Sequence, residues 1–209
     1  MADTGFFVLC GLATFCLLVA IPRWANVISA SLGVLVRAKE VQNFENMMGL
    51  SRDRNLLVGL LFLPFCCTLS WLDVIPLQIL QPFPLSLRCL GVILLLALYG
   101  FLRFVMARYF GPKSMNTRLL KVVNYSFYTF FVLLCFFLLC GCVIFLPFPF
   151  LRAVLSDSVQ WAIFLFYLLF LIRKTQILLS FNSLFKTILY LCALEFLPGA
   201  ALLSAAWFL

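Results

Sequence analysis

The sequence predicts an all-α integral membrane protein, organised as a six-helix transmembrane bundle with an interfacial amphipathic segment after the first span. The first observation behind this is composition: of 209 residues, 66% are hydrophobic and only 11% are charged, and the mean hydropathy is +1.17. About a quarter of the residues are charged in a typical globular domain. We therefore expect the lipid bilayer to be the solvent of this chain.

The second observation is the length of the apolar segments. Crossing about 30 Å of hydrocarbon takes roughly 17 or more apolar residues in a helix. Six segments meet this length, at about residues 5–22, 55–72, 88–107, 120–146, 158–178 and 187–208. The longest hydrophilic stretch is only about 37–54, so residues 1–209 are predicted to form a single polytopic membrane domain.

The third observation is the alternation of basic residues between successive connections. Along the chain the connections carry five, one, five, one and three lysines or arginines. Cytoplasmic loops of membrane proteins are enriched in these residues. Both termini are therefore predicted to lie on the non-cytoplasmic side.

The segment 24–50 is predicted to lie at the inner interface and not to cross the membrane. Its apolar part, residues 24–36, would reach only about 20 Å as a helix. An apolar stripe beside charged neighbours continues from it, at Val34, Ala38, Val41, Phe44 and Met48. Such a stripe is typical of a helix in the plane of the interface.

Two local patterns predict helix ends. The spacing of Asp157 and Gln160 resembles a capping box and predicts that the fifth span begins at Asp157. Gly111 and Pro112 predict that the third helix stops just before them.

Composition also argues against several functions. The chain has no histidine, and its seven acids do not form a paired-carboxylate site, so we predict no metal, no cofactor and no enzyme activity. The nine cysteines lie in or beside apolar runs and are interpreted as small hydrophobic residues. The net charge of +8 is concentrated at the ends of spans, which favours lipid headgroups over nucleic acid as the partner.

Few polar residues lie inside the predicted spans, and Glu195, Arg103 and Asn124 are the candidates for function. Helical rise places Glu195 near the bilayer midplane and Arg103 about 6 Å from it in depth, which an arginine side chain can bridge. Pro198 lacks an N–H group, so it is expected to leave the carbonyl of Leu194 free beside the carboxyl group.

Small residues follow Pro198 at spacings that favour close packing of helices. They are Gly199, Ala200, Ala201, Ser204 and Ala205. Three roles for Glu195 stay open: a contact that fixes its own bundle, a contact with another membrane subunit, and the coupling of a proton or ion.

The C-terminal stretch FKTILYLCALEFLPGAAL resembles the signature of a family of multi-spanning inner-membrane proteins from Bacteroidota, classified only as a domain of unknown function. The likeness extends over most of the chain from about residue 50. It implies a bacterial inner-membrane location and gives weight to Glu195 and Pro198, but it implies no activity.

These observations favour an accessory or scaffold subunit that binds other membrane proteins in the bilayer. The alternative is a small transporter or channel in which Glu195 takes up a proton or cation, with Arg103 as its candidate counter-charge. A third hypothesis is a lipid-modifying membrane enzyme.

Overall fold

The computed structural model describes residues 3–36, 47–75, 81–110, 117–145, 152–179, 187–188, 191–200 and 204. Every regular element in these ranges is helical. The elements are α1 (Thr4–Val36), α3 (Met48–Trp71), α4 (Leu85–Phe110), α5 (Thr117–Phe145), α6 (Arg152–Leu179) and a short π-helix, η3 (Cys192–Phe196).

Five of the described helices are long and apolar enough to cross a membrane, which agrees with a multi-pass α-helical bundle. The sixth predicted span, 187–208, lies largely outside the described residues and stays a prediction.

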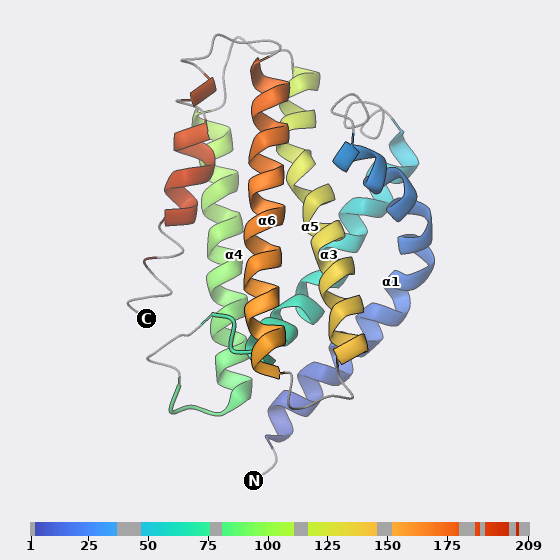
Figure 1. Ribbon diagram of the computed structural model, residues 1–209, viewed down its shortest axis with the longest axis vertical. Coiled ribbons are helices and arrows are strands. Elements are labelled where there is room, and N and C mark those ends of the chain that lie inside the picture. Colours follow the sequence, from blue (N-terminus) through green and yellow to red (C-terminus); the bar gives the residue numbers. More distant parts are fainter. Residues whose placement is uncertain are drawn as a thin grey trace.

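The long helices alternate in direction, so that α1, α4 and α6 run up the view of Figure 1 while α3 and α5 run down it. Helix α3 is central, because it packs against α1, α4 and α5; α6 packs on α5, and η3 packs on α4. The ends of α1, α4 and α6 therefore gather at one end of the bundle, here called the upper end, with the beginnings of α3 and α5.

The buried and exposed faces follow helical periodicity. On α3, Leu57, Leu61 and Leu69 are fully or almost fully buried at spacings of four and eight residues. On α4, Leu94 and Leu98 belong to an exposed apolar stripe. In water such a stripe would be unfavourable, but it suits a helix that meets lipid on one side and the bundle on the other.

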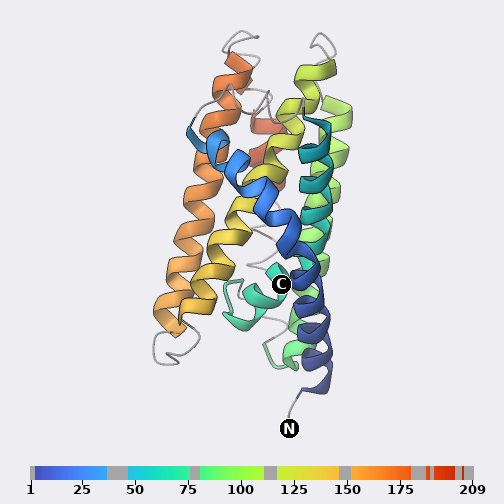
Figure 2. The ribbon, with the colours of Figure 1, turned by 90° about the vertical axis from the view of Figure 1, so that its right-hand side faces the viewer.

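Helix α1 corrects the predicted boundary after the first span. The predicted span 5–22 and the first part of the predicted interfacial segment 24–50 form one helix of 33 residues, which continues through Pro22. At about 1.5 Å per residue this helix is roughly 50 Å long, more than the hydrocarbon thickness. Figure 2 shows it running obliquely and changing direction along its length. Proline removes one backbone hydrogen bond and bends a helix without necessarily ending it.

The rest of the predicted interfacial segment is not tested in the same way. Residues 37–46 lie outside the described residues, and with them Ala38, Val41 and Phe44. Helix α3 already begins at Met48, seven residues before the predicted span 55–72.

The other helix ends show where hydropathy is a poor guide. Helix α6 begins at Arg152 and not at Asp157, so the predicted cap is wrong and Asp157 lies within the helix. Polar residues continue the helix beyond its apolar part. The described part of α4 reaches Phe110, and the predicted stop at Gly111 and Pro112 lies outside the described residues.

The lower end of the bundle is fastened by Asp3. Its carboxylate accepts hydrogen bonds from the Ser86 amide at 2.7 Å and from the Phe6 amide at 3.3 Å. A Cβ atom on Gly5 would lie 3.1 Å from that of Ser86, so the glycine permits the close approach of α1 to α4. The hydrogen bond from the Ser86 backbone lowers the pKa of Asp3 below its ordinary value of 3.8.

This contact predicts a pH-dependent attachment of α1. Because the pKa of Asp3 is lower in the folded protein, its stabilising effect is present above about pH 3.8 and is lost as the pH falls through the lowered value. We expect hydrogen exchange at the Ser86 amide, corrected for the intrinsic rate, to accelerate in that acidic range.

The Asp3→Ala variant, which has no side-chain acceptor for the Ser86 amide, is the control for this prediction. It should exchange quickly at neutral pH and show no acid-dependent change. Equal protection of the Ser86 amide in the two proteins at pH 7 would contradict the prediction.

Candidate functional site

The most unusual group in the bundle is the carboxyl group of Glu195, which is fully buried. It belongs to η3, which packs against α4. In η3 the backbone winds more widely than in an α-helix, and such single π turns are frequent at functional sites. Glu195 is therefore the starting point for the candidate site.

Two cations reach the same oxygen of Glu195. The Nη2 atom of Arg103, from α4, lies 2.9 Å from Oε1, and the Nζ atom of Lys174, from α6, also donates a hydrogen bond to Oε1. The pairing with Arg103, which the sequence left as a possibility, is thus present. We call Arg103, Lys174 and Glu195 the charged cluster.

The charged cluster joins three separate parts of the chain. Arg103 lies about 10 Å from the upper end of α4, and Lys174 about 8 Å from the end of α6, by helical rise. The side chains of Lys174 and Glu195 are inaccessible, and that of Arg103 is 10% exposed. The cluster therefore connects α4 and α6 to the part of the chain around η3. We call the described residues 191–200 and 204 the C-terminal segment.

Sequence reasoning missed Lys174 because it treated this residue as one of the charges that mark the inner loop. Its neighbours carried a usable signal. Phe170, Lys174 and Leu178 are spaced by four residues and are all at most 1% exposed, whereas Arg173 is only half-buried and donates to the exposed Gln176. Helical periodicity therefore places Lys174 on the buried face of α6.

Aromatic rings surround the two cations. The guanidinium carbon of Arg103 lies 3.7 Å from the centre of the Phe127 ring and 5.3 Å from that of Phe170. The Nζ atom of Lys174 lies 5.5 Å from the centre of the Phe170 ring. Such cation–π contacts stabilise a charge that has left water, and Phe170 provides them to both cations.

The charge balance of the cluster is uneven. With all three groups ionised, two positive charges face one negative charge. Within the described part of the chain, the second carboxyl oxygen of Glu195, Oε2, is buried and has no hydrogen-bond partner. The arrangement can therefore fix helices through charge, and it also leaves one acceptor where a proton could be held.

Pro198 and Gly199 adjoin the cluster on its C-terminal side. Pro198 is buried, and the hydroxyl group of Tyr167 donates a hydrogen bond to the backbone carbonyl of Glu195 at 3.2 Å. A Cβ atom on Gly199 would lie 3.5 Å from that hydroxyl group, an ordinary contact. The bond from Tyr167 is made to the carbonyl of Glu195, and the expected free carbonyl of Leu194, one residue earlier, stays a prediction.

The remaining predicted site residues are only partly described. Asn124 lies on α5, but its side chain is outside the described part of the structure. Of the small-residue face, Ala200 and Ser204 are exposed, while Ala201 and Ala205 fall outside the described residues.

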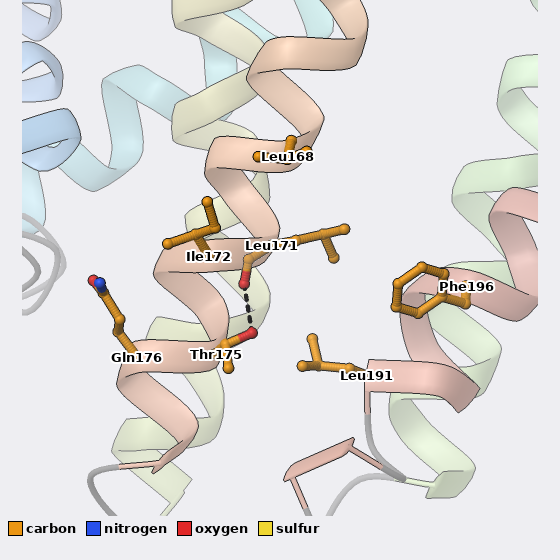
Figure 3. Close-up of a pocket in the computed structure, with 7 residues that line it drawn as sticks. All are labelled: Leu168, Leu171, Ile172, Thr175, Gln176, Leu191 and Phe196. Atoms are coloured by element: carbon orange, nitrogen blue, oxygen red, sulfur yellow. Dashed lines mark hydrogen bonds between the residues drawn. The ribbon is translucent and has the colours of Figure 1, made fainter.

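A shallow apolar groove of about 290 Å³ lies beside the cluster, between α6 and the C-terminal segment. In Figure 3, Leu171 faces Leu191 and Phe196 across the groove, whereas Gln176 points away from it. The Thr175 hydroxyl group donates to the Leu171 carbonyl at 2.7 Å, so this polar atom is already satisfied. The described lining offers an apolar surface and no charged group.

A third buried cation lies on α3, outside the charged cluster. Arg54 is fully buried and donates to Ser51, to Asn55 and, at 3.4 Å, to the Thr129 hydroxyl group of α5. Like Lys174, Arg54 is one of the basic residues that the topology count assigns to a loop, and like Lys174 it is buried inside the bundle. Near the upper end of this bundle, basic side chains serve as internal polar contacts.

Comparison with known proteins adds no relative: no family model, no curated protein and no solved structure matches the chain. The resemblance to the Bacteroidota family therefore stays a prediction.

The uneven charge balance predicts an asymmetric response to mutation. Glu195→Gln removes the carboxylate that both buried cations contact and should lower the free energy of unfolding by about 3–5 kcal/mol. Lys174→Met leaves Arg103 and Glu195 as a balanced pair and should cost much less, on the order of 1 kcal/mol. Denaturant titration in mild detergent micelles measures both.

Arg173→Met is the matched control for these variants, because it removes a neighbouring charge that is only half-buried on the same helix. We expect it to change the free energy of unfolding by less than about 0.5 kcal/mol. If Lys174→Met were as costly as Glu195→Gln, the unequal charge balance would be wrong.

Proposed function

We propose that this protein is an accessory or scaffold subunit of a membrane protein complex in a bacterial inner membrane. One observation carries the proposal. The segment that contains Glu195 is held to its own bundle by the charged cluster, while Ala200 and Ser204 on the same segment are exposed. Small exposed residues on a segment that is held firmly on one side are suited to receive a partner helix.

The burial of Glu195 supports a structural use of its charge. A carboxyl group in hydrocarbon is costly unless it is paired. Here Arg103 and Lys174 both pair with it inside the chain. Because the charge is already compensated, a partner is not needed to neutralise it, and the cluster can set the position of the C-terminal segment before assembly.

The expected partner contact is centred on the small residues 200 and 204, and the large side chains of Phe196 and Leu197 beside it are exposed as well, at 55% and 54%. Leu94 on α4 is 70% exposed and Phe101 is 63% exposed, which suits disordered acyl chains. Ala200 and Ser204 are exposed but small. In membranes, helices associate through small residues spaced by four, because these let two backbones approach closely.

A photo-crosslinking amino acid at position 200 tests this proposal in native membranes. We expect a discrete protein adduct from position 200. The same probe at position 94, on the expected lipid face, should give no discrete protein adduct.

The Ala200→Leu variant makes the test quantitative. It should reduce co-purification of the captured protein at least about tenfold, because a bulky side chain blocks close helix approach. Wild-type protein that is recovered from mild detergent only as a lone monomer would contradict the proposed function.

A second function is favoured by a different observation. Oε2 of Glu195 is buried without a hydrogen-bond partner among the described residues, and Lys174 shares Oε1. Protonation of the carboxyl group, or loss of the lysine proton, would change the charge of the cluster by one. A small proton-coupled transporter would use such a change.

Lys174→Met separates the two functions, because it keeps the Arg103–Glu195 pair and removes the second titratable group. For a scaffold, the variant should assemble with its partner as wild type does. For a proton-coupled transporter, proton uptake into proteoliposomes, measured with an enclosed pH-sensitive dye, should fall to the level of protein-free liposomes. Wild-type proteoliposomes that take up no protons above that level would contradict the second function.

A further inference from the structure

A separate cluster at the lower end of the bundle contains two cysteines from adjacent helices. The Sγ atoms of Cys67, on α3, and Cys89, on α4, lie 3.7 Å apart and form a thiol–thiol hydrogen bond. Cys67 is 6% exposed and Cys89 is inaccessible. They pack with Ala13 of α1 in a small apolar cluster distinct from the main core.

The chain around these cysteines holds the two helix ends together. Cys67 lies four residues before the end of α3 and Cys89 four residues after the start of α4, so each is about 6 Å from a helix end. Between them, Asp73 adopts a left-handed backbone conformation, with φ of 51°. Arg88 pairs with Asp73 at 3.1 Å and also donates to the Gln81 carbonyl at 2.7 Å.

We propose that Cys67 and Cys89 are the site of an intramolecular disulfide that joins α3 to α4. A disulfide has an S–S length of about 2.05 Å, so the two sulfur atoms must approach by less than about 2 Å. They are already in contact, and each lies near the end of a helix that the loop contacts have positioned.

The oxidant would be a protein disulfide on the non-cytoplasmic side, toward which the charge pattern places this end of the bundle. One cysteine thiolate attacks the disulfide of the oxidant and forms a mixed disulfide. The second cysteine then attacks the sulfur of the first and releases the reduced oxidant. Cys67 and Cys89 lose two protons and two electrons, and the oxidant becomes a dithiol. Because both thiols are buried in the finished bundle, the exchange takes place before α4 packs against α3.

Thiol counting tests the inference. Cells are quenched in acid, the protein is denatured, and free thiols are labelled with a maleimide polymer that shifts its migration on a gel. We expect seven of the nine cysteines to react without reductant and all nine after reduction. Tandem mass spectrometry of unreduced peptides should join Cys67 to Cys89.

Three variants make the result specific. In Cys67→Ser and in Cys89→Ser, eight thiols should react both with and without reductant. Cys66→Ser is the matched control, since Cys66 is the adjacent residue and is fully buried in the main core; its count should still rise by two on reduction.

Nine reactive thiols in unreduced wild-type protein would overturn the inference. So would a reducible bond that persists in Cys67→Ser, or one that joins another cysteine such as Cys10. The readout does not involve a partner or transport, so its outcome is separate from that of the proposed function.

Discussion

A carboxyl group enclosed by hydrocarbon has to be neutralised where it lies, because no water can reach it. Glu195 meets this constraint with Arg103 and Lys174, and the rest of the upper bundle is arranged around the result. Helices α4 and α6 must approach the C-terminal segment closely enough for both side chains to reach one oxygen. The Phe127 and Phe170 rings then occupy the space beside the cations, where water would otherwise solvate them.

The two ends of the bundle use different chemistry for the same purpose. At the upper end, arginine and lysine side chains turn inward and make polar contacts between helices, as Arg54 does with Thr129. At the lower end, the contacts include the hydrogen bonds of Asp3 with Ser86, the ion pair of Arg88 with Asp73 and the sulfur pair of Cys67 and Cys89. Hydrophobic burial alone selects helix partners weakly in lipid, so these few polar contacts have a large share in setting which helices adjoin.

The features of this fold that could be predicted from the sequence are those set by the thickness and apolarity of the lipid bilayer. Apolar length located five of the helices, and helical depth identified Arg103 as a possible partner of Glu195. The boundaries of α3 and α6 were placed too late because hydropathy measures the hydrocarbon-facing part, whereas the backbone continues its hydrogen bonds into polar residues such as Asp53 and Asp157.

The same limitation hid part of the candidate site. A lysine or arginine near the end of a span has a long side chain that can reach outward to the interface or inward to the bundle. The count of basic residues that predicts topology treats both directions alike. Only the periodic pattern of the neighbours, as around Lys174, distinguishes them.

The wide turn of η3 has a consequence for how the C-terminal segment could evolve. A π turn accommodates about one more residue than an α turn, so it commonly represents a single inserted residue that the helix has absorbed. The sequence spacing between Leu191 and Ala200, which lie before and after this turn, is therefore about one residue longer than a regular α-helix would need to place them as they are. Losing one residue from Cys192–Phe196 would let this turn return to α-helical geometry while the residues that follow keep their orientation. A one-codon deletion after the wide turn would instead rotate the small-residue face by about a quarter of a turn, so the position of a deletion relative to η3 decides whether that face meets a different neighbour.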